Sequence, residues 1–305
     1  MKTNLFAPAF AALIAAGGLA VSPAQAADLS PPAPAETLPQ VPSALMPGHA
    51  FFGGIGLGIG YSDFTDQSLY AQGVSVITQG GQPYAYGSAG GTTYPNTGSD
   101  TTLTPTAQLG YFQQFSGSDW LWGAKLTYDY LGSSSSQDHV AVPQAGSFTG
   151  PSPGSFTGNV LVRSYETKLN QQIALTPFIG RSFGRGFFYA GAGPSIAQAE
   201  TNLNGVYGFA DINGNHYDIT GQQENYSSSS WVYGATLTAG GTYFLNRSWF
   251  IDASYAVNFT EKSNGDFAGP FSTSAAGFDD KGILSGHFSG GVTTQTVTIS
   301  INRAL

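Results

Sequence analysis

The stretch FFGGIGLGIGY, residues 51–61, alternates large apolar side chains with glycine. The apolar positions are Ile55, Leu57, Ile59 and Tyr61, and the glycines between them are Gly54, Gly56, Gly58 and Gly60. A period of two is that of a β-strand, because successive side chains point to opposite faces. Glycine weakens a strand and marks places where another group comes close. The stretch therefore predicts a strand with one apolar face and one bare face.

The composition is unusual for a soluble domain. Only 9% of the 305 residues are charged, against about 25% in a typical soluble domain. Apolar residues make up an ordinary 41%, which suits a protein whose outer face meets lipid. Lysine and arginine total 10 and form no cluster, so nucleic acid is not an expected partner. The absence of cysteine excludes disulfides, thiolate metal sites and cysteine nucleophiles.

The chain begins with two segments that precede the predicted folded domain. Residues 1–26 predict a cleaved secretory signal peptide, with Lys2 before an apolar core and an A-x-A site at Ala24 and Ala26. Residues 27–49 are rich in proline and predict an extended periplasmic linker. Residues 50–305 are expected to form one domain.

Two-residue alternation returns along that domain and predicts eight strands. The other seven segments are 103–115, 120–130, 167–180, 187–200, 231–245, 249–260 and 296–305. Short connections rich in Gly, Ser and Arg alternate with long ones at 64–101, 132–163, 203–229 and 262–291. This pattern predicts an all-β fold: a transmembrane up-and-down antiparallel β-barrel of eight strands, with short periplasmic turns and long extracellular loops.

Aromatic residues lie near both ends of the predicted strands. Tyr and Trp favour the two interfaces of a membrane, where a ring is half apolar and half wet. The predicted belts contain Trp120, Trp122, Tyr243 and Trp249 beside the short turns, and Tyr130, Trp231 and Phe259 beside the long loops.

Charged residues fall on the faces predicted to line the lumen, namely Lys125, Asp129, Glu166, Lys168 and Asp252. In segment 167–180 the alternation places Leu169 toward lipid and Lys168 inward. Charges in a narrow interior need partners. We expect Lys125 and Asp129 to pair with Glu166 and Lys168 and to block the lumen. The alternative is a selectivity constriction or a proton path.

The signal peptide, the AADL start of the mature chain, the proline-rich lead, the GGIGLGIGY strand and the alternating connections resemble small outer-membrane β-barrel proteins. The nearest group is the opacity-like surface proteins of alphaproteobacteria. The resemblance covers residues 48–305 and is architectural. It implies the bacterial outer membrane, contact with lipid and lipopolysaccharide, and insertion by the barrel-assembly machinery. The chain departs from such barrels by ending in Leu305 instead of an aromatic residue, with Arg303 at a position that is usually apolar.

Three short motifs have alternative interpretations. His287 and Ser289 have the spacing of an outer-membrane lipid A deacylase motif, but Gly290 replaces its asparagine. Asp211, Asn213 and Asn215 have calcium-loop spacing without the glycine and glutamate such a loop needs. The repeat at residues 146–158 is either a surface contact or a low-complexity spacer.

We therefore expect no catalysis, metal or cofactor. The predicted role is structural and surface-exposed, with loops that bind host or environmental partners. The alternative is a porin-like channel for small solutes or hydrophobic molecules, and a lipid-modifying enzyme is the third hypothesis.

Overall fold

The computed structural model describes residues 46–212, 214–275 and 277–305. The predicted signal peptide and most of the predicted linker lie outside the described residues. No helix in the described part of the chain has the length and apolar character needed to cross a membrane. The strands are β1 (His49–Gln79), β2 (Gln82–Thr93), β3 (Gly98–Gln114), β4 (Trp120–Thr149), β5 (Gly154–Ser182), β6 (Gly186–Ile212), β7 (Asn215–Asp218), β8 (Glu224–Phe244), β9 (Trp249–Thr260), β10 (Ser263–Ala275) and β11 (Phe278–Ala304).

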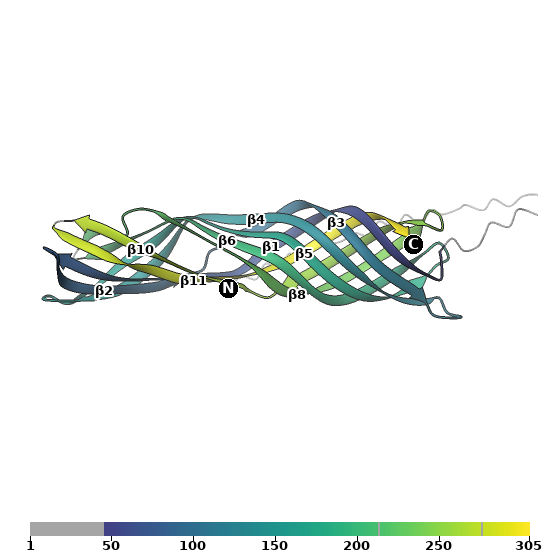
Figure 1. Cartoon of the computed structure of the whole chain (residues 1–305), viewed down its shortest axis with the longest axis horizontal. Helices are drawn as coiled ribbons and strands as arrows, with labels where there is room; N and C mark the ends of the chain where they lie inside the picture. The colour runs from purple at the N-terminus through teal and green to yellow at the C-terminus, as the bar shows by residue number, and fades with distance from the viewer. Residues whose placement is uncertain (1–45, 213, 276) are drawn as a thin grey trace, which may run out of the picture. The chain divides into compact units, whose positions relative to one another are not determined.

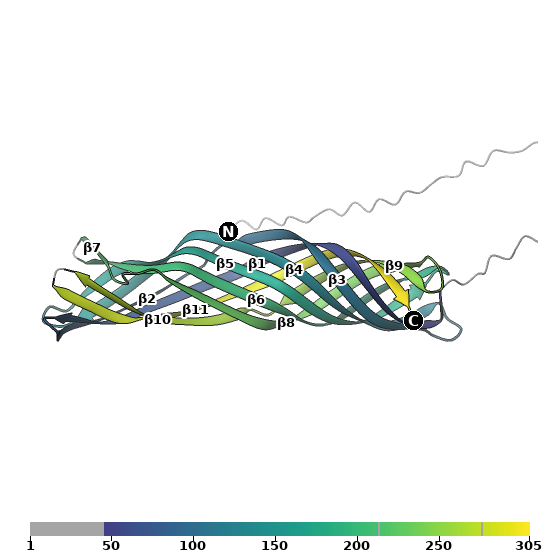
Figure 2. The ribbon, with the colours of Figure 1, turned by 45° about the horizontal axis from the view of Figure 1, so that its top comes forward.

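Eight of these strands close into a ring of antiparallel neighbours. The order is β1, β3, β4, β5, β6, β8, β9 and β11, and β11 pairs again with β1. Figures 1 and 2 show the strands running at a tilt around the barrel, as closure of a sheet requires. The ring leaves no unpaired strand edge. The predicted all-β, eight-stranded antiparallel barrel is confirmed.

Gly56 shows why one face of the opening stretch is bare. A Cβ atom on Gly56 would lie 2.6 Å from the carbonyl oxygen of Ile299 and 2.6 Å from Cβ of Ser300 on β11. A Cβ atom on Gly54 would collide with the side chain of Asn302. The glycines therefore allow β1 and β11 to meet while the side chains of β11 occupy the lumen.

The predicted long loops are largely folded as strands. β1 continues to Gln79 and meets β2 across a tight turn in which Gly80 and Gly81 have φ values of 59° and 79°. β2 also pairs with β4, and β10 pairs with β11. Their Gly-, Ser- and Asn-rich composition is typical of loops, but ladder hydrogen bonds and an apolar interior stabilise them as sheet. We call this part the extension; it comprises the described residues of 66–97, 132–170, 198–230 and 261–291.

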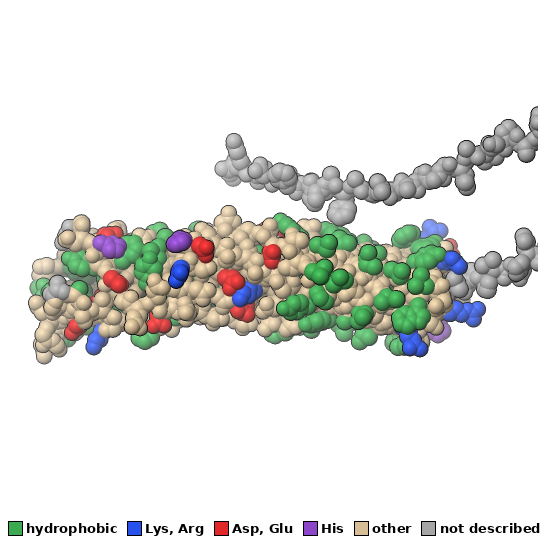
Figure 3. All heavy atoms as spheres, turned by 90° about the horizontal axis from the view of Figure 1, so that it is seen from above, with side chains coloured by type: hydrophobic (Ala, Val, Ile, Leu, Met, Phe, Trp, Pro, Cys, Tyr) green, Lys and Arg blue, Asp and Glu red, His purple; other side chains and the backbone are tan. Residues whose placement is uncertain are grey.

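Outside the extension, apolar side chains cover the outer face of every strand of the ring. We call this surface the apolar band. Its main exposed members are Ile55, Leu57, Ile59, Tyr61, Leu103, Leu109, Leu126, Tyr128, Leu175, Ile179, Phe188, Leu237, Tyr243, Ile251, Tyr255, Val297, Ile299 and Ile301. Figure 3 shows hydrophobic side chains gathered over one part of the barrel, acidic side chains spread mostly over the other part, and Lys and Arg side chains also at the end beyond the hydrophobic surface.

In the extension the polarity of the wall is reversed, so that apolar side chains face inward. The buried cluster there contains Leu69, Ala71, Val140, Val142, Val160, Val162, Tyr165, Leu203, Val206, Phe267, Phe271, Leu284 and Phe288. Most side chains on its outer face are polar, and Val74, Tyr86, Tyr94 and Ile283 are the main apolar or aromatic side chains exposed there. The chain thus changes from a barrel suited to lipid outside to one suited to water outside.

A β-bulge on β5 reverses which residues of that strand face inward, and it overturns one sequence prediction. Leu175 is 49% exposed in the apolar band, whereas Leu169 is fully buried. The register with β6 shifts by one residue between Leu169 and Gln172, and such a slip turns every later side chain to the other face. Leu169 therefore faces inward, and Lys168 and Glu166 face outward. Their predicted inward placement was wrong.

Candidate functional site

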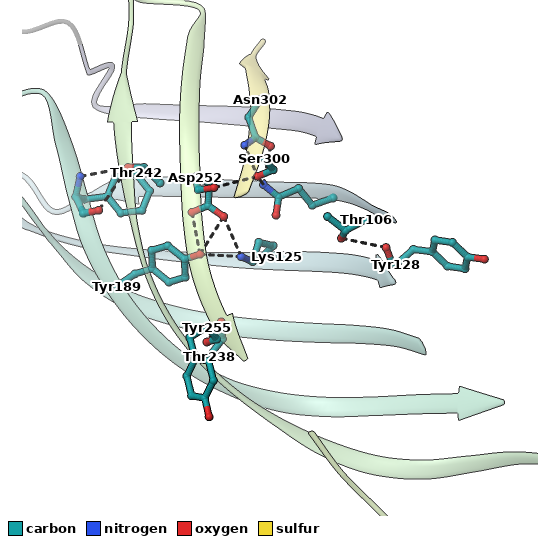
Figure 4. A network of polar contacts seen from close by, with 12 residues as sticks. Thr106, Lys125, Tyr128, Tyr189, Thr238, Thr242, Asp252, Tyr255, Ser300 and Asn302 are labelled. Atoms are coloured by element: carbon teal, nitrogen blue, oxygen red, sulfur yellow. Dashed lines mark hydrogen bonds and ion pairs between the residues drawn. The ribbon is translucent and has the colours of Figure 1, made fainter. Parts of the chain in front are cut away.

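The lumen beneath the extension contains a buried ion pair between Lys125 on β4 and Asp252 on β9. Lys125 Nζ lies 3.3 Å from Asp252 Oδ2, and the side chains are 6% and 4% exposed. The hydroxyl of Tyr189 on β6 accepts a hydrogen bond from Lys125 at 2.7 Å and donates to Asp252 Oδ1 at 2.9 Å. Figure 4 shows the three side chains meeting in the lumen. Each charge therefore has an opposite charge and a hydroxyl as partners.

The contact crosses the barrel from one wall to the other. β4 and β9 are four strands apart in a ring of eight, and β6 lies midway between them. Their side chains meet across the lumen at this level. A barrel of about eight strands is only just wide enough to hold side chains, so the network closes the lumen here.

A second polar group adjoins this network on the side of β1, β3 and β11. Gln108 Nε2 donates to Ser300 Oγ at 2.8 Å and to Asn302 Oδ1 at 2.7 Å. Ser300 Oγ in turn donates to the carbonyl oxygen of Asp252 at 3.4 Å. These bonds link the lumen network to the strand pair that closes the ring (Figure 4).

Apolar residues close the lumen on both sides of the polar layer. At the short-turn end the buried cluster is Met46, Ala50, Phe52, Phe112, Leu121, Phe178, Phe187, Tyr189, Phe244 and Phe250. Toward the extension it is Phe64, Leu131, Leu169, Ala197, Ala199, Val232 and Val292. The polar layer itself holds a cavity of about 30 Å³ beside Lys125 and Asp129. That volume suits a trapped water and does not form a water column.

The remaining predicted lumen charges have other partners. Lys168 Nζ lies 3.1 Å from Glu166 and 3.9 Å from Glu200 on the outer face of the extension. Asp129 lies opposite Gln172 in the β4–β5 ladder, and no ion pair joins it to Lys168 among the described residues. The predicted pairing of Lys125 and Asp129 with Glu166 and Lys168 was therefore wrong, because the bulge removes Glu166 and Lys168 from the lumen.

The residues predicted to form aromatic belts lie on the outer surface at the two edges of the apolar band. Their exposed fractions range from 40% for Trp249 to 52% for Tyr130. The set is Trp120, Trp122, Tyr130, Trp231, Tyr243, Trp249 and Phe259. At the short-turn edge the Arg303 guanidinium lies 6.0 Å from the ring centre of Trp249. Arg303 thus covers apolar surface with its stem while its charge reaches the edge.

The short motifs are placed apart from the lumen. His287 lies on the outer face of the extension and stacks on Tyr70, with ring centres 5.1 Å apart. No hydrogen bond joins His287 to Ser289 within the described residues. His216 lies 2.9 Å from Asp211, whereas Asn213, the middle residue of the calcium-like spacing, lies outside the described residues. The described residues contain no group of three or more potential metal ligands.

A third buried polar group lies in the extension and centres on Gln67. The Tyr165 hydroxyl donates to Gln67 Oε1 at 3.0 Å, and Thr167 Oγ1 donates to the same atom at 3.4 Å. Burial raises the pKa of Tyr165 to about 12, although the Thr167 hydroxyl acts in the opposite direction. Gln67 lies within the bulge on β1 between Thr65 and Ser68. The two-residue alternation did not identify Gln67 or Tyr189 as inward-facing. Gln67 lies at a β-bulge, and Tyr189 follows two other aromatic residues, so the alternation does not indicate which face either side chain occupies.

No protein-family model matches the sequence, and no curated protein sequence matches it. Among solved structures the chain is similar to Ail, the attachment invasion locus protein of Yersinia pestis, at 11% identity over 78% of this chain and 98% of that chain, with a TM-score of 0.24. It is similar to the outer membrane protease OmpT from Escherichia coli at 11% identity, over 84% and 97%, with a TM-score of 0.34. It is similar to the outer membrane protein OprG from Pseudomonas aeruginosa at 13% identity, over 81% and 95%, with a TM-score of 0.30. Similarity this low carries no argument about activity, and the fold rests on the strand ladders themselves.

Proposed function

We propose that the chain is a bacterial outer-membrane protein whose closed barrel anchors a folded, surface-exposed extension. The observation that carries this proposal is the apolar band, which surrounds all eight strands of the ring. Water-exposed apolar patches of this extent are rare on soluble monomers and mark protein or membrane contact sites. A closed barrel in lipid has no unpaired backbone groups at an edge.

The dimensions of the band support a membrane span. On β4 the outward face is apolar from Trp120 to Tyr130, which is 11 residues, and becomes polar at Ser134 and Ser136. A transmembrane strand needs about 9–11 residues when it is tilted by about 45°. Aromatic residues at both edges of the band match the two interfaces of a membrane.

The difference between the two rims of the barrel supports an orientation of the chain across the membrane. The described chain begins and ends at the rim with the short turns, where Leu305 N donates to Phe51 O at 2.8 Å. We place this rim in the periplasm, and the extension on the outer side, in contact with lipopolysaccharide at its base. The barrel-assembly machinery would then insert the chain, and the role is that of a surface protein of the opacity-like kind.

The filled lumen favours a structural and surface role over a porin-like channel. Apolar clusters lie on both sides of the Lys125–Asp252 pair, and the cavity between them has a volume of only about 30 Å³. We propose a non-enzymatic role, because the lumen charges and the His287 region form no arrangement of a nucleophile with a base.

Fractionation and conductance together test this proposal. The mature chain should sediment with outer membranes and migrate differently on denaturing gels before and after heating. The refolded protein in planar bilayers should show no sustained conductance, with an open porin inserted under the same conditions as the positive control. Recovery in the soluble periplasm would contradict the membrane barrel, and a large steady conductance would favour the channel.

A further inference from the structure

The tip of the extension encloses two adjoining cavities that the proposed function does not use. The outer cavity has a volume of about 320 Å³ and the inner one about 80 Å³. Both are lined by Ile77, Phe148, Ile212, Ile219 and Asp280. We call the two cavities together the tip chamber. The hairpin repeat of residues 146–158 contributes Phe148 and Phe156 to its wall, so this repeat is part of a folded cavity and not a spacer.

Asp280 is a charged residue in an otherwise apolar wall. Its side chain belongs to a residue that is only 9% exposed, and its Oδ1 atom has no hydrogen-bond partner. A buried carboxylate with an unmatched oxygen and no opposite charge is costly. Burial raises the pKa of Asp280, and the Ser75 hydroxyl offsets this only in part. The unmatched Oδ1 atom therefore lacks a donor from the described part of the chain.

Gln144 adds a second unpartnered acceptor to the same chamber. Its Nε2 atom donates to Ala71 O at 3.2 Å and to Val142 O at 3.4 Å, which fixes the amide, and its Oε1 atom has no partner. Gln144 is 6% exposed and lines the inner cavity. Like Asp280 Oδ1, Gln144 Oε1 accepts hydrogen bonds, so the inner cavity also has an unmatched acceptor in its wall.

The charge of the wall defines the ligand further. The charged residues that line the tip chamber are Asp280 and Asp218, and neither a lysine nor an arginine is among the lining residues. Lys281, the next residue along β11, is exposed on the outer face. A ligand with a positive charge would supply the counter-ion that the chain does not provide.

We propose that the tip chamber binds a small organic cation with an apolar body, such as an alkyl- or arylammonium, whose N–H groups bond to Asp280. The apolar body packs against Ile77, Phe148 and Ile219. Access is from the tip, because the outer cavity is lined by hairpin residues such as Tyr84 and Tyr217, which are 39% and 38% exposed.

Calorimetric titration of the full mature protein in lipid nanodiscs tests the proposal, with empty nanodiscs as the blank. The probes are benzylamine, benzyl alcohol and benzoate, which share a ring and differ in charge. Benzylamine should bind with saturation, and at least about ten-fold more tightly than benzoate. No saturable benzylamine binding, or equal affinity for benzoate, would overturn the proposal.

Matched variants distinguish binding in the tip chamber from non-specific attraction of the cation to negative charge. Asp280→Asn should weaken benzylamine binding by about ten-fold or more and leave benzyl alcohol within about two-fold. The variant should fold, because it removes an unpaired buried charge. Asp279→Asn makes the same change on the exposed neighbour and should leave both affinities unchanged. Equal losses in the two variants would contradict the site.

A filling variant tests the location. A Cβ atom on Gly73, which lines the inner cavity, would meet nothing within 4 Å. Gly73→Leu should therefore occupy the chamber without strain on the wall, and it should abolish binding of benzylamine and benzyl alcohol alike. Binding that persists in Gly73→Leu would place the ligand elsewhere and overturn the proposal.

Discussion

Lys125 and Asp252 join opposite walls of the barrel, with Nζ and Oδ2 3.3 Å apart and Tyr189 bonded to both. The pair lies between two apolar layers that fill the lumen on either side. It therefore fixes the cross-section of the barrel and closes it at the same point. Removing one partner of this buried pair should therefore cost more stability than removing one partner of a surface ion pair.

Replacement of Lys125 by Ala should destabilise the barrel by about 3–5 kcal/mol, because Asp252 would remain buried without an opposite charge. The double variant Lys125→Ala/Asp252→Ala should recover part of that loss. Urea unfolding in lipid vesicles, followed by tryptophan fluorescence, measures both. If the double variant loses as much unfolding free energy as the two single variants lose together, the two residues are not coupled.

The control for these single and double variants is the exposed pair of Arg181 and Asp119. Its charged atoms lie 3.9 Å apart, and both side chains are 67% exposed. Arg181→Ala should change stability by about 0–1 kcal/mol, because water screens the pair. A loss as large as that of Lys125→Ala would mean that the urea measurement reports general charge removal.

Arginine substitutions on the outer face of β4 should have effects that depend on depth. Leu126 lies in the apolar band, and Ser136 lies on the same outward face in the extension. Leu126→Arg should cost about 2–4 kcal/mol, the cost of arginine at the middle of a bilayer, whereas Ser136→Arg should be nearly neutral. Refolding yield and urea midpoint measure the difference. Equal effects would place both positions in the same medium.

The glycines of β1 should differ in their tolerance of a side chain. Gly56→Val should destabilise the closure between β1 and β11 by about 1–3 kcal/mol or more, as overpacking does, since the new Cβ would lie 2.6 Å from Ser300. Gly73→Ala is the control, because no atom lies within 4 Å of its Cβ position. Migration of unheated and heated samples on denaturing gels reports closure. A fully closed Gly56→Val barrel would contradict the close approach.

Tyr165 should make the stability of the extension depend on high pH. Its pKa is raised to about 12 by burial, so the unfolded chain loses the phenol proton first, above about pH 10. The buried phenol therefore makes its full contribution to stability below pH 10, and the free energy of unfolding falls by about 2–3 kcal/mol as the pH rises to 12. Tyr165→Phe lacks this loss, and the difference between the two unfolding curves isolates it. A difference that is constant from pH 9 to pH 12 would contradict a buried phenol.

The sequence predicts the part of the fold that depends on a regular period of two. Leu57, Leu126 and Ile299 alternate with small or polar residues without interruption, and all three lie outward as their period indicates. The alternation of short and long connections also predicts the antiparallel ring. These features depend on local spacing, so a single sequence carries them.

The sequence does not predict the features that depend on bulges or on ring stagger. One extra residue between Leu169 and Gln172 reverses the facing of Lys168, and no residue in that stretch marks it. The extension resembles loops in sequence because it is rich in Gly and Ser, and its strands are stabilised by ladder pairing and by the apolar interior that they enclose together. The Lys125–Asp252 contact requires strands four places apart in the ring, and only the closed barrel determines that they meet.

The proposal that the apolar band lies in lipid is tested most directly by spin labels on β8. The chain has no cysteine, so Leu237→Cys and Ser227→Cys each give one labelling site. Both positions face outward, Leu237 in the apolar band and Ser227 in the extension. In reconstituted liposomes the label at 237 should collide with oxygen and be shielded from a water-soluble nickel chelate, and the label at 227 should show the reverse. Equal access of the nickel chelate to both labels would contradict a membrane-spanning band.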